Sequence, residues 1–281
     1  MNLDYWIDQV LAEDIGEGDH STLSCVPKEA IDEAILLVKE PGILAGIEES
    51  QQIFHRFDPN LEVEVAIQDG SRVFPGDRAF EVKGSARSIL TSERLVLNVM
   101  QRMSGVATKT DHLASMISHT SATLLDTRKT TPGMRGLEKK AVTIGGGSNH
   151  RHGLYDMIML KDNHLDYAGG LEPALARTRA YLAERNLDLK IEVEVRDREE
   201  LLELLKLDLP DRIMLDNFPP VDLVWACGLI DGRAETEASG GIKEETIVSV
   251  AETGVDFISV GALTHSVNNL DLSLKAKSSL D

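Results

Sequence analysis

The sequence contains little cysteine and fewer basic than acidic residues. Each shortage excludes some classes of protein. Its 281 residues include two cysteines, Cys25 and Cys227, which lie far apart and show no zinc-ligand spacing. We therefore expect two buried thiols in a reducing compartment. The chain carries 29 Lys and Arg against 47 Asp and Glu, a formal net charge of −18. Nucleic acids and anionic membranes favour a basic protein surface, so neither is expected as a partner.

Signals for export, membrane insertion and nucleophilic catalysis are missing as well. The first residues show neither the basic nor the apolar region of a signal peptide, and no apolar run approaches the roughly 20 residues that span a bilayer. We therefore expect a soluble, cytoplasmic protein. No G-x-S-x-G motif occurs and neither cysteine has basic neighbours, so a nucleophilic triad is not indicated.

The first ninety residues mix helical and strand patterns. Apolar spacing predicts a helix over residues 3–13, and buried or alternating segments predict strands over 34–38, 61–67 and 79–82. A further helix is expected from Ser92, with Ser92 itself as the N-cap. The apolar face of that helix would include Leu95, Val99, Met103 and Val106.

Later in the chain, short apolar segments recur with helix-like stretches between them. Each segment ends at a polar residue or a glycine, and the last four ends are 22 or 23 residues apart, which suits a βα unit. The segments cover residues 122–125, 157–160, 191–195, 213–215, 236–238 and 257–260. Parallel strands with functional groups at their carboxyl ends are typical of an α/β barrel, whose site lies on that face. We place the start of the barrel near residues 105–115.

Basic side chains gather at the first two of these strand ends. Arg128 and Lys129 lie among threonines, His150 and Arg151 follow three consecutive glycines, and Lys161 ends an apolar strand. Arginine offers a bidentate fork and lysine a point charge to phosphate or carboxylate. The alternatives are a solvated loop for the first group and a flexible turn for the second.

Acidic residues follow at the next strand ends. The alternation of residues 191–195 puts Glu192 and Glu194 on one face of a strand, and Asp216 ends the strand after it. Glu194 and Asp216 together suit ribose hydroxyls or Mg²⁺, although either residue alone is more often a helix cap. For His164, close to Lys161, we expect a capping or structural role.

Glycines mark the last two strand ends. Ser239, Gly240 and Gly241 follow one strand, and the Val260–Ala262 turn, with Gly261 at its centre, follows the other. Backbone N–H groups at such junctions can bind a phosphate. These residues alone suggest a barrel enzyme that acts on a phosphorylated sugar and a second anion. A non-catalytic sugar-phosphate sensor and an aldolase with Lys161 as its Schiff-base lysine remain alternatives.

The ordered set of motifs resembles the quinolinate phosphoribosyltransferase family, the decarboxylating enzymes of NAD synthesis. The resemblance covers nearly the whole chain. It rests on Glu13–Asp19, Gly42–Gly46, Glu93-Arg94, Asn98, Gln101–Gly105, Asp126–Thr130, Asn149–Arg151, Lys161–His164, Glu192–Val195, Leu215–Asn217, Glu237–Ile242 and Gly261–Ser266. Lys140 departs from the family pattern, in which an aromatic residue is frequent at that position.

The resemblance implies an α/β fold of two domains. The first, residues 1–108, is an α/β sandwich with which the tail 268–281 would pack. The second, residues 109–267, is an open, TIM-like α/β barrel with the site at the carboxyl face of its strands. It also implies a homodimer, or a multiple of one, with shared active sites.

The resemblance further implies the reaction and the role of each site residue. Quinolinate and phosphoribosyl pyrophosphate would give nicotinate mononucleotide, pyrophosphate and CO₂, with Mg²⁺ as cofactor. The substrate-binding residues would be Arg94 (from the partner subunit), Thr127, Arg128, Lys129, His150, Arg151, Lys161, Glu194, Asp216, Ser239, Gly240, Gly241, Val260, Gly261 and Ala262. Lys129, Lys161, Glu194 and Asp216 would be catalytic, and Glu194 and Asp216 would hold the metal. The alternative is a related pyrophosphorylase or phosphoribosyltransferase of the same barrel family with a different base.

Overall fold

The computed structural model describes residues 2–277, which fold into two compact units. Within the described residues, the first unit contains 2–111, 130–146 and 263–277, and the second contains 112–129 and 147–262. The domain bounds given above, 1–108 and 109–267, stay a prediction. Residues 278–281 of the predicted C-terminal tail lie outside the described residues.

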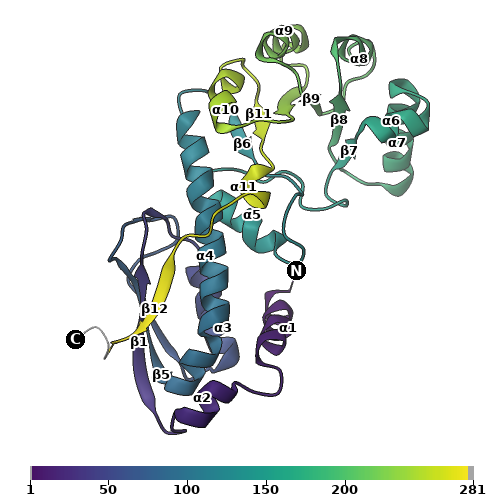
Figure 1. The fold of residues 1–281 in the computed structure, drawn as a ribbon. Coiled ribbons are helices and arrows are strands. Elements are labelled where there is room, and N and C mark those ends of the chain that lie inside the picture. Colours follow the sequence, from purple (N-terminus) through teal and green to yellow (C-terminus); the bar gives the residue numbers. More distant parts are fainter. Residues whose placement is uncertain (1, 278–281) are drawn as a thin grey trace. The chain divides into compact units, whose positions relative to one another are not determined.

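The first unit is built on an antiparallel sheet with the strand order β12-β1-β5-β3. The strands are β1 (Ile31–Val38), β3 (Glu62–Val65), β5 (Arg78–Ser85) and β12 (Leu272–Ala276). A separate two-stranded sheet contains β2 (Gly42–Ile43) and β4 (Arg72–Val73). The three predicted strands are therefore confirmed, and β12 joins the sheet from the far end of the sequence by pairing with β1 (Figure 1).

Helices complete the first unit. They are α1 (Leu3–Ile15), α2 (His20–Cys25), α3 (Ile47–Phe57), α5 (Arg135–Ile144) and the start of α4 (Ala86–Met116). Phe54 of α3 meets Phe80 of β5 edge to face, with 5.9 Å between ring centres. The predicted apolar face of α4 is confirmed, because all four of its residues are buried. Lys140 of α5 pairs with Glu49 of α3 at 2.7 Å.

Two predictions are wrong, one for the first unit and one for the cysteines, which lie in different units. Ser92 does not cap α4, which begins six residues earlier, directly after β5. Ser85 accepts a hydrogen bond from the Ser88 backbone N–H there, whereas the buried Ser92 hydroxyl donates to the Ser88 carbonyl inside the helix. Cys25 is exposed at the end of the short helix α2, and Cys227 is only half-buried, so they are not two buried thiols.

The second unit is an open sheet of six parallel strands with the order β6-β11-β10-β9-β8-β7. All six predicted segments are strands: β6 (Thr123–Leu125), β7 (Ile158–Leu160), β8 (Ile191–Val195), β9 (Arg212–Asp216), β10 (Glu235–Ser239) and β11 (Phe257–Ser259). Helices follow the strands and lie on the outer side of the curved sheet (Figure 1). They are α6 (Asp162–Ala168), α7 (Leu171–Arg185), α8 (Arg198–Leu204), α9 (Pro220–Ile230) and α10 (Glu244–Ala251). The short helix α11 (Ala262–His265) begins at the last residue of the second unit and otherwise belongs to the first. The α/β fold with an open parallel barrel is therefore confirmed.

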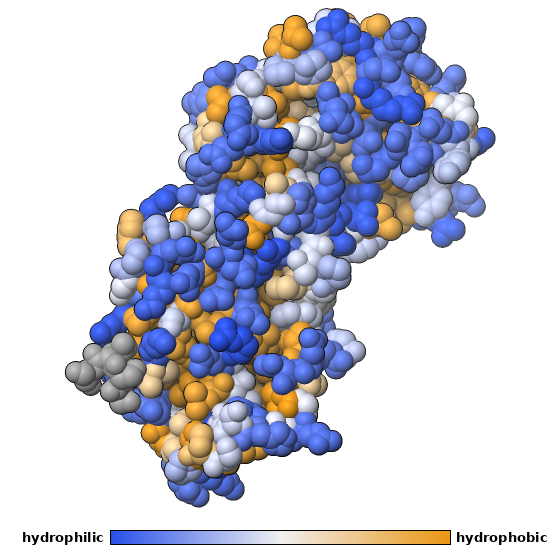
Figure 2. Space-filling model, viewed as in Figure 1, coloured by the Kyte–Doolittle hydropathy of each residue, from blue (hydrophilic) through white to orange (hydrophobic). Residues whose placement is uncertain are grey.

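Hydrophilic side chains dominate the face of the molecule seen in Figure 2, in keeping with the 76 charged residues of the sequence. Among residues 2–277, no helix combines the length and the apolar composition needed to cross a bilayer.

Candidate active site

A cavity of about 330 Å³ lies in the second unit, among residues at and near the carboxyl ends of the parallel strands. Its lining contains seven of the predicted site residues: Thr127, Arg128, Lys129, His150, Arg151, Lys161 and Ser239. Met159, Met214, Glu237 and Ser259 complete the lining. The predicted position of the site, on the carboxyl face of the strands, agrees with this cavity.

The loops after β6 and before β7 are held together by backbone and side-chain contacts. Asp126 is fully buried, and its carboxylate accepts a hydrogen bond from the His150 backbone N–H at 2.9 Å. Leu125 forms a parallel bridge with Ser148. These contacts fix the backbone that carries Arg128 on one side and Arg151 on the other.

Arg128 and Arg151 lie close enough for their charges to repel. Burial, followed by the charge of Arg128, lowers the pKa of the Arg151 guanidinium from its ordinary value. Arg151 donates one hydrogen bond, at 3.2 Å, to the Met157 carbonyl. A bound anion would relieve the repulsion, so this wall of the cavity is suited to a carboxylate or phosphate.

Lys161 meets an acidic partner across the sheet. Its ammonium lies 2.6 Å from the Glu194 carboxylate, and these residues extend from β7 and β8, which are neighbours. His164 accepts a hydrogen bond from the Lys161 backbone N–H and so caps α6. The predicted capping role of His164 is thereby confirmed.

The ends of β9 and β10 approach each other closely. The Asn217 backbone N–H donates to the Ser239 carbonyl at 2.8 Å. Gly240 has φ of +93°, and a Cβ at this position would lie 2.8 Å from the Asn217 nitrogen, so only glycine fits. Asp216 accepts a hydrogen bond from the Asn217 side-chain amide at 2.7 Å.

The remaining predicted residues lie outside the lining of the cavity. Glu194, Asp216, Gly240, Gly241, Val260, Gly261 and Ala262 occupy the ends of β8 to β11 or the turns that follow them. Arg94 belongs to α4 in the first unit. The roles predicted for all these residues stay predictions.

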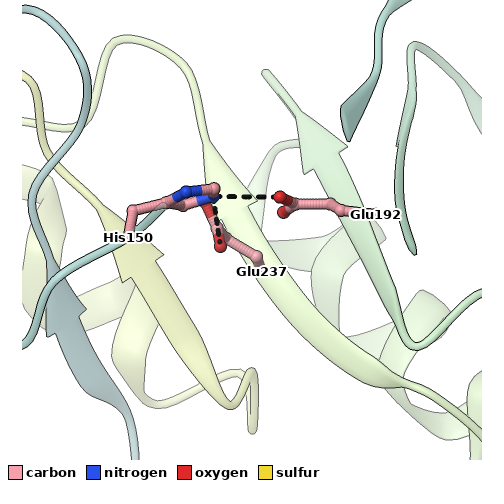
Figure 3. Close-up of side chains that lie close together, drawn as sticks. All are labelled: His150, Glu192 and Glu237. Carbon is pink, nitrogen blue, oxygen red and sulfur yellow. Dashed lines mark ion pairs between the residues drawn. The ribbon is translucent and has the colours of Figure 1, made fainter. Parts of the chain in front are cut away.

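Three buried side chains meet at the inner side of the sheet, and the predicted site included only one of them. The ring of His150 points at the carboxylates of Glu192 and Glu237, with Nε2–oxygen distances of 2.9 and 3.5 Å (Figure 3). Arg212 donates to Glu237 at 2.9 Å. The period-two pattern would have placed Glu237 beside Ser239 and Arg212 beside Asp216 on the inward face.

The open parallel barrel, with a cationic cavity at its strand ends, is the architecture of an α/β-barrel enzyme that binds small anions. Comparison with models of known protein families identifies the enzyme family. The model for "Quinolinate phosphoribosyl transferase, N-terminal domain" matches residues 19–104, and that for the C-terminal domain matches residues 106–275. The chain belongs to the quinolinate phosphoribosyltransferase family.

Relatives support this assignment over nearly the full length. "Quinolinate phosphoribosyltransferase [decarboxylating] 1" of Nicotiana glauca is 47% identical, over 98% of this chain and 82% of that protein. "Probable nicotinate-nucleotide pyrophosphorylase [carboxylating]" of Bacillus subtilis is 39% identical, over 98% and 93%. The solved nicotinate-nucleotide pyrophosphorylase of Francisella tularensis superposes with a TM-score of 0.91 at 38% identity, over 98% of this chain and 96% of that one. Some plant relatives are named as chloroplastic or mitochondrial proteins.

Proposed function

We propose that this protein transfers the phosphoribosyl group of phosphoribosyl pyrophosphate to quinolinate. The products are nicotinate mononucleotide, pyrophosphate and CO₂. The observation that carries the proposal is the cationic cavity of the second unit, in a chain that matches both domains of the family.

Quinolinate is a dianion, and the basic wall of the cavity suits it. Arg128, Arg151 and Lys161 hold its two carboxylates, and Thr127 and Lys129 lie beside them in the lining. His150 belongs to the same wall. These groups orient the pyridine ring, which brings its nitrogen to the sugar and makes the reaction effectively intramolecular.

Phosphoribosyl pyrophosphate is assigned to the ends of β8 to β11. Ser239, Gly240 and Gly241, with the Val260–Ala262 turn, bind the 5′-phosphate through backbone N–H groups. The strand register puts Glu194 and Asp216 on the same face of neighbouring strands, with Glu194 paired to Met214. There they meet the ribose hydroxyls.

Mg²⁺ fits the same two carboxylates. Each carboxylate has one oxygen engaged, with Lys161 or Asn217, and a second oxygen that can bind a hard cation. When bound, the metal would neutralise negative charge on the pyrophosphate.

The reaction needs no side-chain nucleophile. The bond from ribose C1 to the pyrophosphate oxygen breaks, and the lone pair of the pyridine nitrogen forms the new bond to C1. Lys129 and Lys161 stabilise the negative charge of the leaving group, whereas Glu194 and Asp216 favour the positive charge that develops on the ribose. Loss of the 2-carboxylate as CO₂ leaves its electron pair on the ring carbon, which takes up a proton.

We also propose a cytoplasmic homodimer in which Arg94 completes the site of the partner subunit. Arg94 lies on α4, outside the unit that contains the cavity. The free cysteines Cys25 and Cys227 suit a reducing compartment.

The test is to incubate the protein with Mg²⁺, phosphoribosyl pyrophosphate and either quinolinate or nicotinate. We expect CO₂ and nicotinate mononucleotide from quinolinate and no product from nicotinate. Turnover of nicotinate alone would instead identify a phosphoribosyltransferase for a different base, and turnover of neither would refute the proposal.

A further inference from the structure

The cluster of His150, Glu192 and Glu237 places ionisable groups where burial is costly. Glu192 and Glu237 are completely buried, and His150 is 7% exposed. Both oxygens of Glu192 and Oε1 of Glu237 have no hydrogen-bond partner among the described residues. Burying two carboxylates side by side is unfavourable unless cations and donors compensate them. Such a cluster therefore calls for an explanation beyond packing.

The cluster is either a metal site or a network of polar side chains. The hydrogen bond at Nδ1 of His150 distinguishes these two explanations. The three side chains are near enough to hold a metal ion. However, the Arg151 backbone N–H donates to His150 Nδ1 at 2.7 Å, so Nδ1 is an acceptor and the proton of the neutral ring lies on Nε2. A metal would need the lone pair of Nε2, and its histidine ligands normally donate, rather than accept, through the other nitrogen. The geometry therefore favours a polar network without a metal, in which Nε2–H faces the Glu192 carboxylate at 2.9 Å.

Arg212 supplies the compensating charge. Its guanidinium donates to Glu237 at 2.9 Å and to Glu235 at 3.1 Å, and lies 3.8 Å from the centre of the Phe257 ring. Arg212 is 8% exposed, so solvent screens these interactions little. Without it, two buried carboxylates would share a single imidazole.

The network leads from the interior of the barrel to the basic wall of the cavity. Arg212 on β9 holds Glu237 on β10. Glu237 and Glu192 orient the His150 ring, and its Nδ1 holds the backbone of Arg151. The His150 backbone N–H is fixed separately by Asp126. Displacement of the ring would therefore move Arg151.

We propose that Arg212, Glu192 and Glu237 are positioning residues that orient His150 and, through Nδ1, hold Arg151 in place for a substrate carboxylate. The proposal rests on the proposed function, because the carboxylate is that of quinolinate. It assigns to Arg212 an effect on quinolinate without direct contact, since Arg212 does not line the cavity. Phosphoribosyl pyrophosphate, bound at the other strand ends, is unaffected.

The experiment compares Arg212→Met with Arg198→Met in the full-length protein. Arg198 is a matched control in the same unit, since it pairs with Asp222 and lies 4.6 Å from the centre of the Trp225 ring. For Arg212→Met we expect KM for quinolinate to rise about tenfold, with KM for phosphoribosyl pyrophosphate within about twofold of the wild type. Arg198→Met should leave both unchanged. A parallel rise of both constants in Arg212→Met, or no rise in either, would overturn the proposal.

A double variant separates positioning from general destabilisation. Arg212→Met/Glu237→Gln removes the uncompensated carboxylate as well, so KM for quinolinate should return toward the wild-type value. If KM for quinolinate were higher in the double variant than in Arg212→Met, the result would contradict the proposed network.

A second measurement does not depend on turnover or on folding of any Arg212 variant. Nitrogen-15 NMR of histidine-labelled wild-type protein, with His150→Asn for assignment, should show Nδ1 of His150 unprotonated and Nε2 protonated. A proton on Nδ1 would refute the network. Failure of the proposed function would appear differently, as a wild-type protein that neither binds nor converts quinolinate while the ring nitrogens remain as expected.

Discussion

Glu237 should make the stability of the second unit fall as the pH rises. Burial, followed by the charge of Glu192, raises the pKa of this carboxyl from its ordinary 4.5 to about 7. Between these values the folded protein holds a proton that the unfolded chain has released. Stability is therefore highest below pH 4.5 as far as this group is concerned, and it decreases until the carboxyl ionises near pH 7. The difference corresponds to about 3 kcal/mol of unfolding free energy.

Replacement of Glu237 by glutamine keeps the shape of the protonated acid and removes the titration. We expect Glu237→Gln to lose most of this pH dependence, and to be more stable than the wild type at pH 8. The exposed Glu245 of α10 provides a control, because Glu245→Gln should follow the wild type at every pH.

Urea unfolding between pH 5 and 8 measures the effect. The protein has two tryptophans, and Trp225 of α9 lies in the same unit as Glu237. A Trp6→Phe background therefore lets fluorescence report on that unit. Parallel stability curves for Glu237→Gln and its parent would show that the buried carboxyl is ionised throughout, and would refute the reasoning.

Four further predictions concern the proposed reaction. Arg151→Ala should raise KM for quinolinate by roughly 10- to 100-fold, the cost of losing a charged hydrogen bond, and KM for phosphoribosyl pyrophosphate far less; steady-state kinetics that show equal changes would contradict the assignment. Mixing Arg94→Ala subunits with Lys161→Ala subunits should restore part of the activity, because one hybrid site then carries both native residues; no recovery would exclude sharing of the site. Chelation of Mg²⁺ should abolish turnover in the CO₂-release assay, and activity in the presence of excess chelator would exclude the metal role. Gly240→Ala should displace Asn217 and raise KM for phosphoribosyl pyrophosphate, and unchanged kinetics would show that this turn does not bind the phosphate.

The strands of the barrel could be predicted from sequence because each is a short apolar segment that ends at a polar residue or glycine. The start of α4 could not be predicted, because α4 follows β5 directly and no loop separates the two in the sequence. Ser85 and Ser92 are both chemically suitable caps, and only the tertiary position of Ser92 in the core distinguishes them.

The residues of the site also divide into those that the sequence could predict and those that it could not. Arg128, Arg151 and Lys161 stand out in the sequence because they lie at or between predicted strand ends, where cations have few structural uses. Glu237 and Arg212 fall inside strands, where a charge is normally read as solvent-facing. The pairing of Arg212 with Glu237 depends on strand order, β9 beside β10, which spacing alone does not give.

The ion pair between Lys161 and Glu194 has a consequence for the order of events at the site. In the free protein each of these groups is occupied by the other. A carboxylate that takes Lys161 frees the Glu194 oxygen that Lys161 holds, so that both oxygens of Glu194 can serve the ribose and its metal. Occupation of that oxygen sets Lys161 free in turn. Each substrate thus removes a side chain that competes with the other substrate for its binding group. The two substrates should bind with positive cooperativity, and thermodynamic linkage requires the factor to be the same whichever binds first.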